Sequence, residues 1–252
     1  MTMRDERNDI PRVIHYCWFG GKPLPREAEK CLDSWRRHMP GCELRRWDES
    51  NYRPDAVPFT AEAARQGLWA FVSDYARFDI LFNHGGIYLD TDVELVASLD
   101  PLLKRGAYMG WEKTSTSLGV NSGLGMAAPA GMEIFAEVLA DYAERPFADA
   151  KGNRLAGTVV TVVTDLLLRH GLVLADTEQK VAGLTVYPSE YFNPLDDLTG
   201  RLNIGPKTYS IHHFAKTWLG QPAWRTRLSR AAHRWLGLDM TAKLKRLSKF
   251  KK

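Results

Sequence analysis

The chain has 252 residues, of which 44% are hydrophobic and 25% are charged, so its composition is that of a globular protein with room for a sizeable core. The charged opening stretch, MTMRDERNDIPR, lacks the apolar segment of a secretory signal, and no apolar run approaches the ~20 residues that span a bilayer. Three cysteines without metal-like spacing favour reduced thiols in a cytoplasmic protein.

The net charge of +4 is divided unevenly along the chain. Residues 221–252 hold ten Lys or Arg and one acid, whereas the other 220 residues hold 24 bases and 29 acids. We therefore expect a globular body over residues 1–220 and a separate basic tail over 221–252.

The first elements along the chain predict an α/β protein. VIHYCWF at 13–19 is β-branched and aromatic and ends in Gly20-Gly21, as a strand and its turn would. Apolar residues at helical spacing predict a helix over 25–38, and CELRRWD at 42–48 predicts a second strand. Strand, helix and strand in this order indicate a βαβ unit and a mostly parallel sheet.

The longest helical pattern lies within residues 61–86. It is broken near Gly67 and stops at Gly85-Gly86, the residue type common at helix C-termini. A strand, IYLD, follows directly. Later patterns predict a strand at 119–128, helices near 131–144 and 158–170, and short strands or loops at 183–194 and 208–218.

Two acids, Asp90 and Asp92, stand one residue apart where the IYLD strand ends. They would lie on the same side of an extended chain, where their like charges repel unless a cation lies between them. Carboxylate oxygens suit Mg²⁺ or Mn²⁺, so the pair is a candidate half of a divalent-metal site. The alternative is a pair of turn or cap residues, because Asp is common in turns.

A second charged pair lies on the preceding predicted helix. Asp74 and Arg77 are three residues apart and share a helix face, among mostly apolar neighbours. One reading is an internal salt bridge, since buried charges need partners. The other gives Asp74 a sugar hydroxyl and gives the forked guanidinium of Arg77 a phosphate or sugar oxygen.

Trp18 stands at the end of the first predicted strand. Open α/β sheets bind ligands at the carboxyl ends of their strands, so this ring could stack on a nucleotide base. A core position is the alternative. No GxGxxG or Walker-type lysine motif follows Gly20-Gly21, which argues against a dinucleotide or P-loop site.

The segment IHHFAKTW at 211–218 supplies further candidates. The imidazole of His212 or His213 could bind a metal, and Lys216 could oppose a phosphate charge. Adjacent residues of a strand point to opposite sides, so at most one histidine would face a site. A structural histidine is the alternative.

Two polar residues are weaker candidates, Asn121 in GVNSG and Tyr191 in SEYFNP. The chain has no GxSxG elbow, no HExxH and no Cys–His nucleophile signature. Covalent hydrolase chemistry therefore has little support.

Three stretches in this order, IPRVIHYCWFGGKPLP, then SW with P and WDE, then WAFVSDYARFDILFNHGGIYLDTDVE, resemble glycosyltransferase family 32. These are DxD-containing sugar transferases of capsular polysaccharide synthesis, related to fungal mannosyltransferases and to the catalytic domains of glucosylating toxins. The resemblance is strong over residues 10–95 and looser over 191–218. The stretch 68–94 is far more specific than an isolated DxD.

The resemblance implies a GT-A fold, in which a Rossmann-like nucleotide half adjoins an acceptor half. It also implies a retaining transfer of sugar from a nucleotide sugar, with Mn²⁺ or Mg²⁺ bridging the diphosphate. UDP is favoured as the nucleotide through the bacterial members. A departure is Ala156-Gly157-Thr158, where the family often has Thr-Gly-Pro near the sugar.

Roles on the donor follow from the same resemblance. Trp18 would stack on the base, while Asp74 and Arg77 would hold the sugar and diphosphate. Arg77 and Lys216 would stabilise charge on the leaving diphosphate. The candidate substrate-binding residues are Trp18, Asp74, Arg77, Asp90, Asn121, Lys216 and Trp218.

Roles at the metal follow as well. Asp90 would contact the ribose and the metal, and Asp92 would bind the metal directly. His212 matches the late histidine of the family by its six-residue distance to Trp218, with His213 as the alternative. The candidate metal ligands are Asp90, Asp92 and His212, and the candidate catalytic residues are Asp74, Arg77, Asp90 and Asp92.

The basic tail has apolar residues at helical spacing, namely Trp224, Leu228, Ala231, Trp235 and Leu238. A basic amphipathic helix with Trp is typical of a segment on an anionic membrane surface, where each basic residue contributes roughly 1 kcal/mol. The alternative is an apolar face packed on the body. Nucleic acid is not expected as a partner, because no recognition fold accompanies the charge. We expect a cytoplasmic protein held at the inner face of the plasma membrane.

The leading hypothesis is a metal-dependent glycosyltransferase that moves a sugar to a glycan or lipid-linked acceptor in surface polysaccharide synthesis. A metal-dependent phosphohydrolase using the same acids is one alternative. A non-catalytic sugar-nucleotide-binding protein on the same fold is another. No residue is an obvious nucleophile, so we favour a front-side transfer in which the leaving phosphate assists the acceptor hydroxyl.

Overall fold

The computed structural model of the chain describes residues 9–148 and 157–215. Its elements in chain order are β1 (Val13–Cys17), α1 (Arg26–His38), β2 (Glu43–Trp47), α2 (Pro58–Arg65), α3 (Trp69–His84), β3 (Gly86–Tyr88), β4 (Val93–Leu95), α4 (Asp100–Leu103), β5 (Tyr108–Lys113), β6 (Leu118–Asn121), β7 (Met126–Ala128), α5 (Glu133–Glu144), α6 (Val159–Arg169), β8 (Gln179–Val181), β9 (Leu184–Tyr187), the 3-10 helix η2 (Ser189–Tyr191) and β10 (Ser210–His212). Within these residues, no helix combines the length and the apolar character needed to cross a membrane. The predicted tail helix and the boundary after residue 220 lie outside the described residues.

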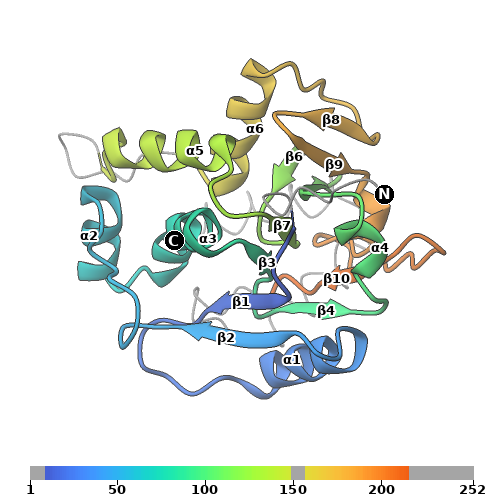
Figure 1. The fold of residues 1–252 in the computed structure, drawn as a ribbon, viewed down its shortest axis with the longest axis horizontal. Coiled ribbons are helices and arrows are strands. Elements are labelled where there is room, and N and C mark those ends of the chain that lie inside the picture. The colour runs from blue at the N-terminus through green and yellow to red at the C-terminus, as the bar shows by residue number, and fades with distance from the viewer. Residues whose placement is uncertain (1–8, 149–156, 216–252) are drawn as a thin grey trace, which may run out of the picture.

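One mixed sheet forms the centre of the protein, with strand order β2-β1-β3-β7-β5-β9-β8 and with β6 paired to β5 (Figure 1). β1 is parallel to β2 and to β3, and β5 is parallel to β9. The predicted α/β class is therefore confirmed. The carboxyl ends of β1, β3, β5 and β9 share one edge of the sheet, the edge at which α/β proteins bind ligands.

The prediction of a mostly parallel sheet is wrong for the second half of the chain. β7 runs antiparallel to β3 and to β5, and β8 runs antiparallel to β9. The strand predicted at 119–128 is in fact two strands, β6 and β7, separated by a turn around Gly123. The short connections from β5 to β6 and from β8 to β9 favour antiparallel pairing, because a parallel pair needs a long crossover.

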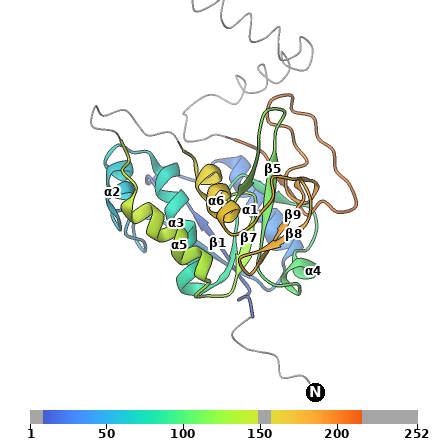
Figure 2. The same ribbon diagram turned by 90° about the horizontal axis from the view of Figure 1, so that it is seen from above.

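Two hydrophobic clusters cover the two faces of the sheet. Apolar side chains of α2, α3, α5 and α6 pack on one face, and those of α1, α4 and β4 pack on the other. Figure 1 shows α3, α5 and α6 on the opposite side of β1 from α1, and Figure 2 shows α3 and α5 side by side. Along β1 the side chains alternate, with Ile14 and Tyr16 in the α1 cluster and Cys17 in the α3 cluster.

The long helical pattern is broken where the sequence predicts. α2 ends before Gly67, which has a φ of +69°, and α3 begins two residues later. α3 ends at Gly85, with a φ of +61°, and the Gly85 N–H donates to the carbonyl of Leu81. A Cβ at Gly85 would lie 2.8 Å from the backbone nitrogen of Ala130, so only glycine fits where the chain turns from α3 into β3.

Helix α1 fixes the start of β4, directly after the DxD residues. The Trp35 side chain is fully buried, and its indole N–H donates to the Val93 carbonyl at 2.7 Å. The Ser34 hydroxyl accepts a hydrogen bond from the Leu95 N–H at 2.9 Å. β4 in turn pairs with β10 in antiparallel register, which places His212 opposite Val93.

Candidate functional site

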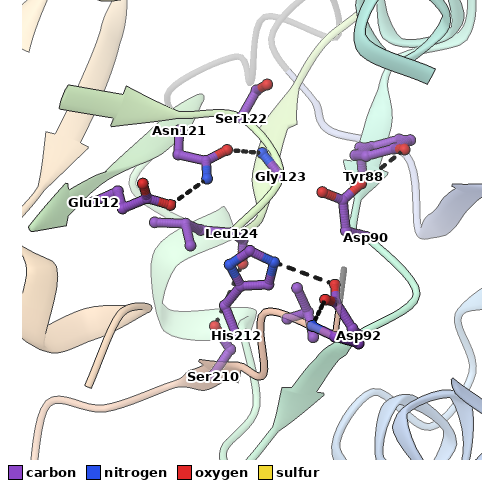
Figure 3. Close-up of polar contacts among 12 residues, drawn as sticks. Tyr88, Asp90, Asp92, Glu112, Asn121, Ser122, Gly123, Leu124, Ser210 and His212 are labelled. Carbon is purple, nitrogen blue, oxygen red and sulfur yellow. Dashed lines mark hydrogen bonds and ion pairs between the residues drawn. The ribbon is translucent and has the colours of Figure 1, made fainter. Parts of the chain in front are cut away.

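The DxD acids lie in the short connection between β3 and β4, at the carboxyl edge of the sheet. The Val93 N–H donates to the Asp90 carbonyl at 3.0 Å, which closes the turn around the two acids. Because β10 pairs with β4, His212 is brought next to this turn, and its Nε2 atom lies 3.2 Å from Oδ1 of Asp92 (Figure 3). The other oxygen of Asp92 accepts the Ala215 N–H at 2.8 Å.

The three residues fit a divalent cation. One ligand atom from each of Asp90, Asp92 and His212 can be chosen so that all lie within 4.8 Å of one another. The Nδ1 atom of His212 is buried and has no hydrogen-bond partner, so the contact with Asp92 is the ring's only described polar anchor. Two carboxylates and an imidazole are a donor set that Mn²⁺ and Mg²⁺ sites use, and a cation would remove the repulsion between the acids.

The structure distinguishes the two adjacent histidines by position. His212 is buried and faces Asp92, whereas the side chain of His213 is 42% exposed and its Nε2 lies 2.9 Å from Oε2 of Glu94. This is the alternation expected of neighbouring residues on a strand. Lys216 and Trp218 lie outside the described residues.

The Arg77 guanidinium connects the Asp74–Arg77 pair to the DxD acids. Its Nη2 atom lies 3.0 Å from Oδ1 of Asp74 and 3.2 Å from Oδ1 of Asp90. It also donates from Nη1 to the Ser122 hydroxyl at 3.3 Å, and it lies over the Tyr88 ring at 5.0 Å. Arg77 is only 4% exposed, so the internal salt bridge considered in the sequence is present and extends to the DxD acid.

Burial and neighbouring charges set the pKa values of these groups. Burial raises the pKa of Asp74 to about 6, although Arg77 opposes the shift, and burial likewise raises the pKa of Asp90. Burial would also raise the pKa of Asp92, but His212 outweighs it and lowers that pKa to about 2. Burial would lower the pKa of His212, but Asp92, then Asp90 and Glu112, raise it to about 9. Without a cation, the pair is an imidazolium and a carboxylate.

The turn between β6 and β7 forms one wall of the site, and Figure 3 shows it facing Asp90. Asn121, a weaker candidate from the sequence, is buried and lies at its start. Its side chain donates to Glu112 at 2.6 Å and accepts the Gly123 N–H at 2.7 Å. A Cβ at Gly123 would lie 2.1 Å from Oδ2 of Asp90, so glycine is required for the wall to approach the acid.

Sequence reasoning missed three residues of this site, Tyr88, Glu112 and Gly123. The Tyr88 hydroxyl donates to Oδ1 of Asp90 at 3.1 Å, from the strand that carries the acid. The period of two would have put Tyr88 and Asp90 on one side of the chain. Glu112 carries no such local signal, because it reaches the site only through the pairing of β5 with β6.

The remaining candidates lie apart from the acids. Trp18 follows β1 at the same edge of the sheet and is half-buried, and its indole N–H donates to the Lys22 carbonyl at 2.6 Å. Tyr191 stacks between Tyr187 and Tyr209, with ring centroids 4.8 Å and 5.7 Å away. Its contacts belong to an aromatic cluster beyond β9.

The segment that departs from the expected Thr-Gly-Pro leads into α6. Thr158 is the residue before this helix, and the backbone of Val159, its first residue, helps to lower the pKa of Asp74. Ala156 lies outside the described residues.

Residues 25–108 match the protein family described as "Glycosyltransferase sugar-binding region containing DXD motif". The match thus includes the DxD stretch that the sequence singles out. The matched stretch contains Asp74, Arg77 and both DxD acids, and the match confirms the resemblance to a DxD glycosyltransferase family. His212 lies beyond the matched residues and reaches the acids through β10.

The chain also has relatives among fungal proteins. Inositol phosphoceramide mannosyltransferase 1 of Schizosaccharomyces pombe is 29% identical over 115 residues, which are 41% of this chain and 34% of the relative. Inositol phosphoceramide mannosyltransferase 3 of the same organism is 30% identical over 130 residues, 45% of this chain and 32% of the relative. The chain therefore matches about a third of the length of these relatives.

A likeness to solved structures extends over more of the chain. The crystal structure of a glycosyltransferase involved in the glycosylation of the major capsid of PBCV-1 is 13% identical, with a TM-score of 0.47. The likeness covers 86% of this chain and 100% of that chain.

Proposed function

We propose that the protein is a metal-dependent retaining glycosyltransferase that moves a sugar from a nucleotide sugar, with UDP favoured, to a hydroxyl of a glycan or lipid-linked glycan. The observation that carries the proposal is the grouping of Asp90, Asp92 and His212 beside the Asp74–Arg77 pair, within and next to a DXD-type sugar-binding region. The names of the fungal relatives, inositol phosphoceramide mannosyltransferases, are compatible with a lipid-linked acceptor.

In this proposal Asp90, Asp92 and His212 hold Mn²⁺ or Mg²⁺. A bound cation would supply Lewis-acid stabilisation of the charge that develops on the leaving diphosphate. Arg77 is already shared between two carboxylates, so its part in the reaction is to hold Asp74 and Asp90 in place at the donor. Asp74 would accept hydrogen bonds from sugar hydroxyls, and Trp18 would stack on the base.

The described residues near the acids include no activated serine, cysteine or lysine. We therefore favour front-side transfer, in which the bond from the anomeric carbon to the phosphate oxygen breaks as the bond to the acceptor oxygen forms. The acceptor proton passes to the departing phosphate oxygen, so the chain itself supplies no nucleophile. Its residues position donor and acceptor and exclude water, which accounts for a large share of the rate in such sites.

The basic tail supports a proposal about location. Ten basic residues and one acid over residues 221–252, with apolar residues at helical spacing, suit an anionic membrane surface. A cytoplasmic enzyme held there would meet an acceptor that grows on a lipid carrier.

Calorimetry of UDP binding tests the proposed function. The proposal expects UDP to bind the protein in the presence of Mn²⁺, and expects EDTA or Asp92→Asn to weaken that binding by at least tenfold. Asp33→Asn on α1, an exposed acid paired with Arg36, is the matched control and should bind as the wild type does. Equal UDP binding with Mn²⁺ and with EDTA would refute the metal-dependent site.

A further inference from the structure

We propose that Glu112 is a positioning residue: it orients the Asn121 amide, which holds the turn at Ser122-Gly123 against Asp90 and thereby sets the place of that carboxylate in the site. The inference rests on the proposed function, since it concerns how the metal-binding acid is held. It adds a residue on β5, outside the matched residues 25–108.

The contacts form a continuous chain from β5 to the acid. Glu112 and Asn121 lie on adjacent strands in antiparallel register. Oε2 of Glu112 accepts from Nδ2 of Asn121 at 2.6 Å, and Oδ1 of Asn121 accepts from the Gly123 N–H at 2.7 Å. The Asp90 N–H then donates to the Gly123 carbonyl at 3.3 Å. Gly123 is therefore bonded to Asn121 through its N–H and to Asp90 through its carbonyl.

The charge of Glu112 decides which way the amide faces. An ionised carboxylate only accepts hydrogen bonds, whereas an amide has a donating NH₂ end and an accepting carbonyl end. The NH₂ end of Asn121 must therefore face Glu112, and the carbonyl end is left for the Gly123 N–H. A flipped amide would set its carbonyl against the carboxylate and its NH₂ against a backbone donor, which breaks both bonds. Partly buried hydrogen bonds to a charged group are among the stronger ones.

The turn at Ser122-Gly123 limits where the Asp90 carboxylate can lie. Oδ1 of Asp90 is held on one side by the Tyr88 hydroxyl and by Arg77, at 3.1 Å and 3.2 Å. Oδ2 lies against the Gly123 backbone, so closely that a Cβ there would be 2.1 Å away. The Ser122 hydroxyl also accepts a hydrogen bond from Arg77, so this one short turn contacts both Asp90 and the guanidinium that is paired with it. A shift of this turn is a shift of the ligand atom.

A variant that exchanges the carboxylate and the amide between residues 112 and 121 separates the positioning role from a direct role of the Glu112 charge. In the double variant Glu112→Gln with Asn121→Asp, the new carboxylate accepts both from the Gly123 N–H and from the glutamine NH₂. The hydrogen bonds of the turn are kept while the charge moves from residue 112 to residue 121. The single variant Asn121→Asp instead opposes two carboxylates, and Glu112→Ala removes the acceptor.

The test is the Mn²⁺ affinity of these variants by calorimetry, with thermal unfolding to show that each is folded. Loss of an outer-shell partner typically weakens metal binding by 10–100-fold, and we expect about tenfold or more for Glu112→Ala and for Asn121→Asp. The double variant should recover to within about threefold of the wild type. As a matched control, Glu190→Ala removes a surface carboxylate paired with Lys207 and should leave Mn²⁺ affinity unchanged.

Two results would overturn the inference while leaving the proposed function in place: wild-type Mn²⁺ affinity in Glu112→Ala, or a double variant no better than Asn121→Asp. The second would mean that the charge of Glu112 itself, and not the orientation of Asn121, is what the site uses. Failure of the wild-type protein to bind Mn²⁺ would reject the proposed function and this inference together.

Discussion

The Nη2 atom of Arg77 lies 3.2 Å from Oδ1 of Asp90, so a buried cation from helix α3 is paired with the first acid of the DxD turn. The same atom lies 3.0 Å from Asp74. Burial opposes a charged guanidinium, but Asp90, Tyr88 and Asp74 together raise the pKa of Arg77 above its usual value. One side chain thus joins helix α3 to the turn that carries the DxD acids.

Removing this cation should destabilise the fold as well as the site. In Arg77→Met, the two partly buried carboxylates that Arg77 neutralises lose their partner, and we expect the free energy of unfolding to fall by about 3 kcal/mol. Chemical denaturation measures the change. The control Arg65→Met removes an exposed partner of Glu62 on α2 and should leave the denaturation midpoint almost unchanged. A loss no larger than in this control would contradict the buried bridge.

Metal binding should raise the thermal stability through Asp92. A ligand that binds only the folded state stabilises it, and the gain grows with the logarithm of the ratio of ligand concentration to dissociation constant. We expect Mn²⁺ to raise the melting temperature of the wild-type protein and to have little effect on Asp92→Asn. Thermal unfolding at several Mn²⁺ concentrations measures this. An equal Mn²⁺-dependent rise in both proteins would show that the ion binds elsewhere.

The close approach of Gly123 to Asp90 predicts a steric effect. Gly123→Ala places a Cβ 2.1 Å from Oδ2 of Asp90, so the carboxylate must move, and we expect Mn²⁺ affinity to fall about tenfold or more. Gly205→Ala is the matched control, because a Cβ there meets no atom within 4 Å and should leave the affinity unchanged. Calorimetry compares the two. Equal affinities would mean that Asp90 is not fixed by the turn.

A buried histidine outside the site predicts how stability depends on pH. His15 is fully buried, its Nε2–H donates to the Gly85 carbonyl at 3.0 Å, and its Nδ1 accepts the Trp47 indole N–H at 3.0 Å. Burial, with Arg45, lowers the pKa of His15 to about 4 from 6.5. The unfolded chain therefore takes up a proton first as the pH falls. This contribution to stability is complete above pH 6.5 and is lost as the pH falls toward 4.

The free energy of unfolding should fall by about 1.4 kcal/mol for each pH unit between pH 6.5 and 4, or by about 3 kcal/mol in all, through His15. Denaturation of wild type and His15→Gln at several pH values between 4 and 7 isolates it as a difference in slope. Parallel pH dependences of the two proteins would contradict the neutral, buried His15.

The parts predicted well from sequence are those whose signals are local. The break at Gly67, the strand that delivers Asp90, and the shared face of Asp74 and Arg77 all follow from spacing and turn residues within one segment. The alternation of His212 and His213 was also local, although which of them faces Asp92 depends on the register of β10 against β4.

The parts that could not be predicted depend on contacts between distant segments. Whether β7 runs parallel or antiparallel between β3 and β5 is decided by sheet pairing, which no short pattern encodes. Glu112 is an ordinary strand-end acid in the sequence, and it becomes part of the site only because β5 pairs with β6. The contact of Gly123 with Asp90 likewise requires the folded turn.

Release of free nucleotide from a panel of UDP- and GDP-sugars, with Mn²⁺ or with EDTA, is the direct test of metal-dependent sugar transfer. It can be run without an acceptor, because slow transfer to water also releases the nucleotide. We expect UDP release from one sugar donor, abolished by EDTA and by Asp92→Asn and retained by Asp33→Asn. Release that continues unchanged in EDTA or in Asp92→Asn would contradict it.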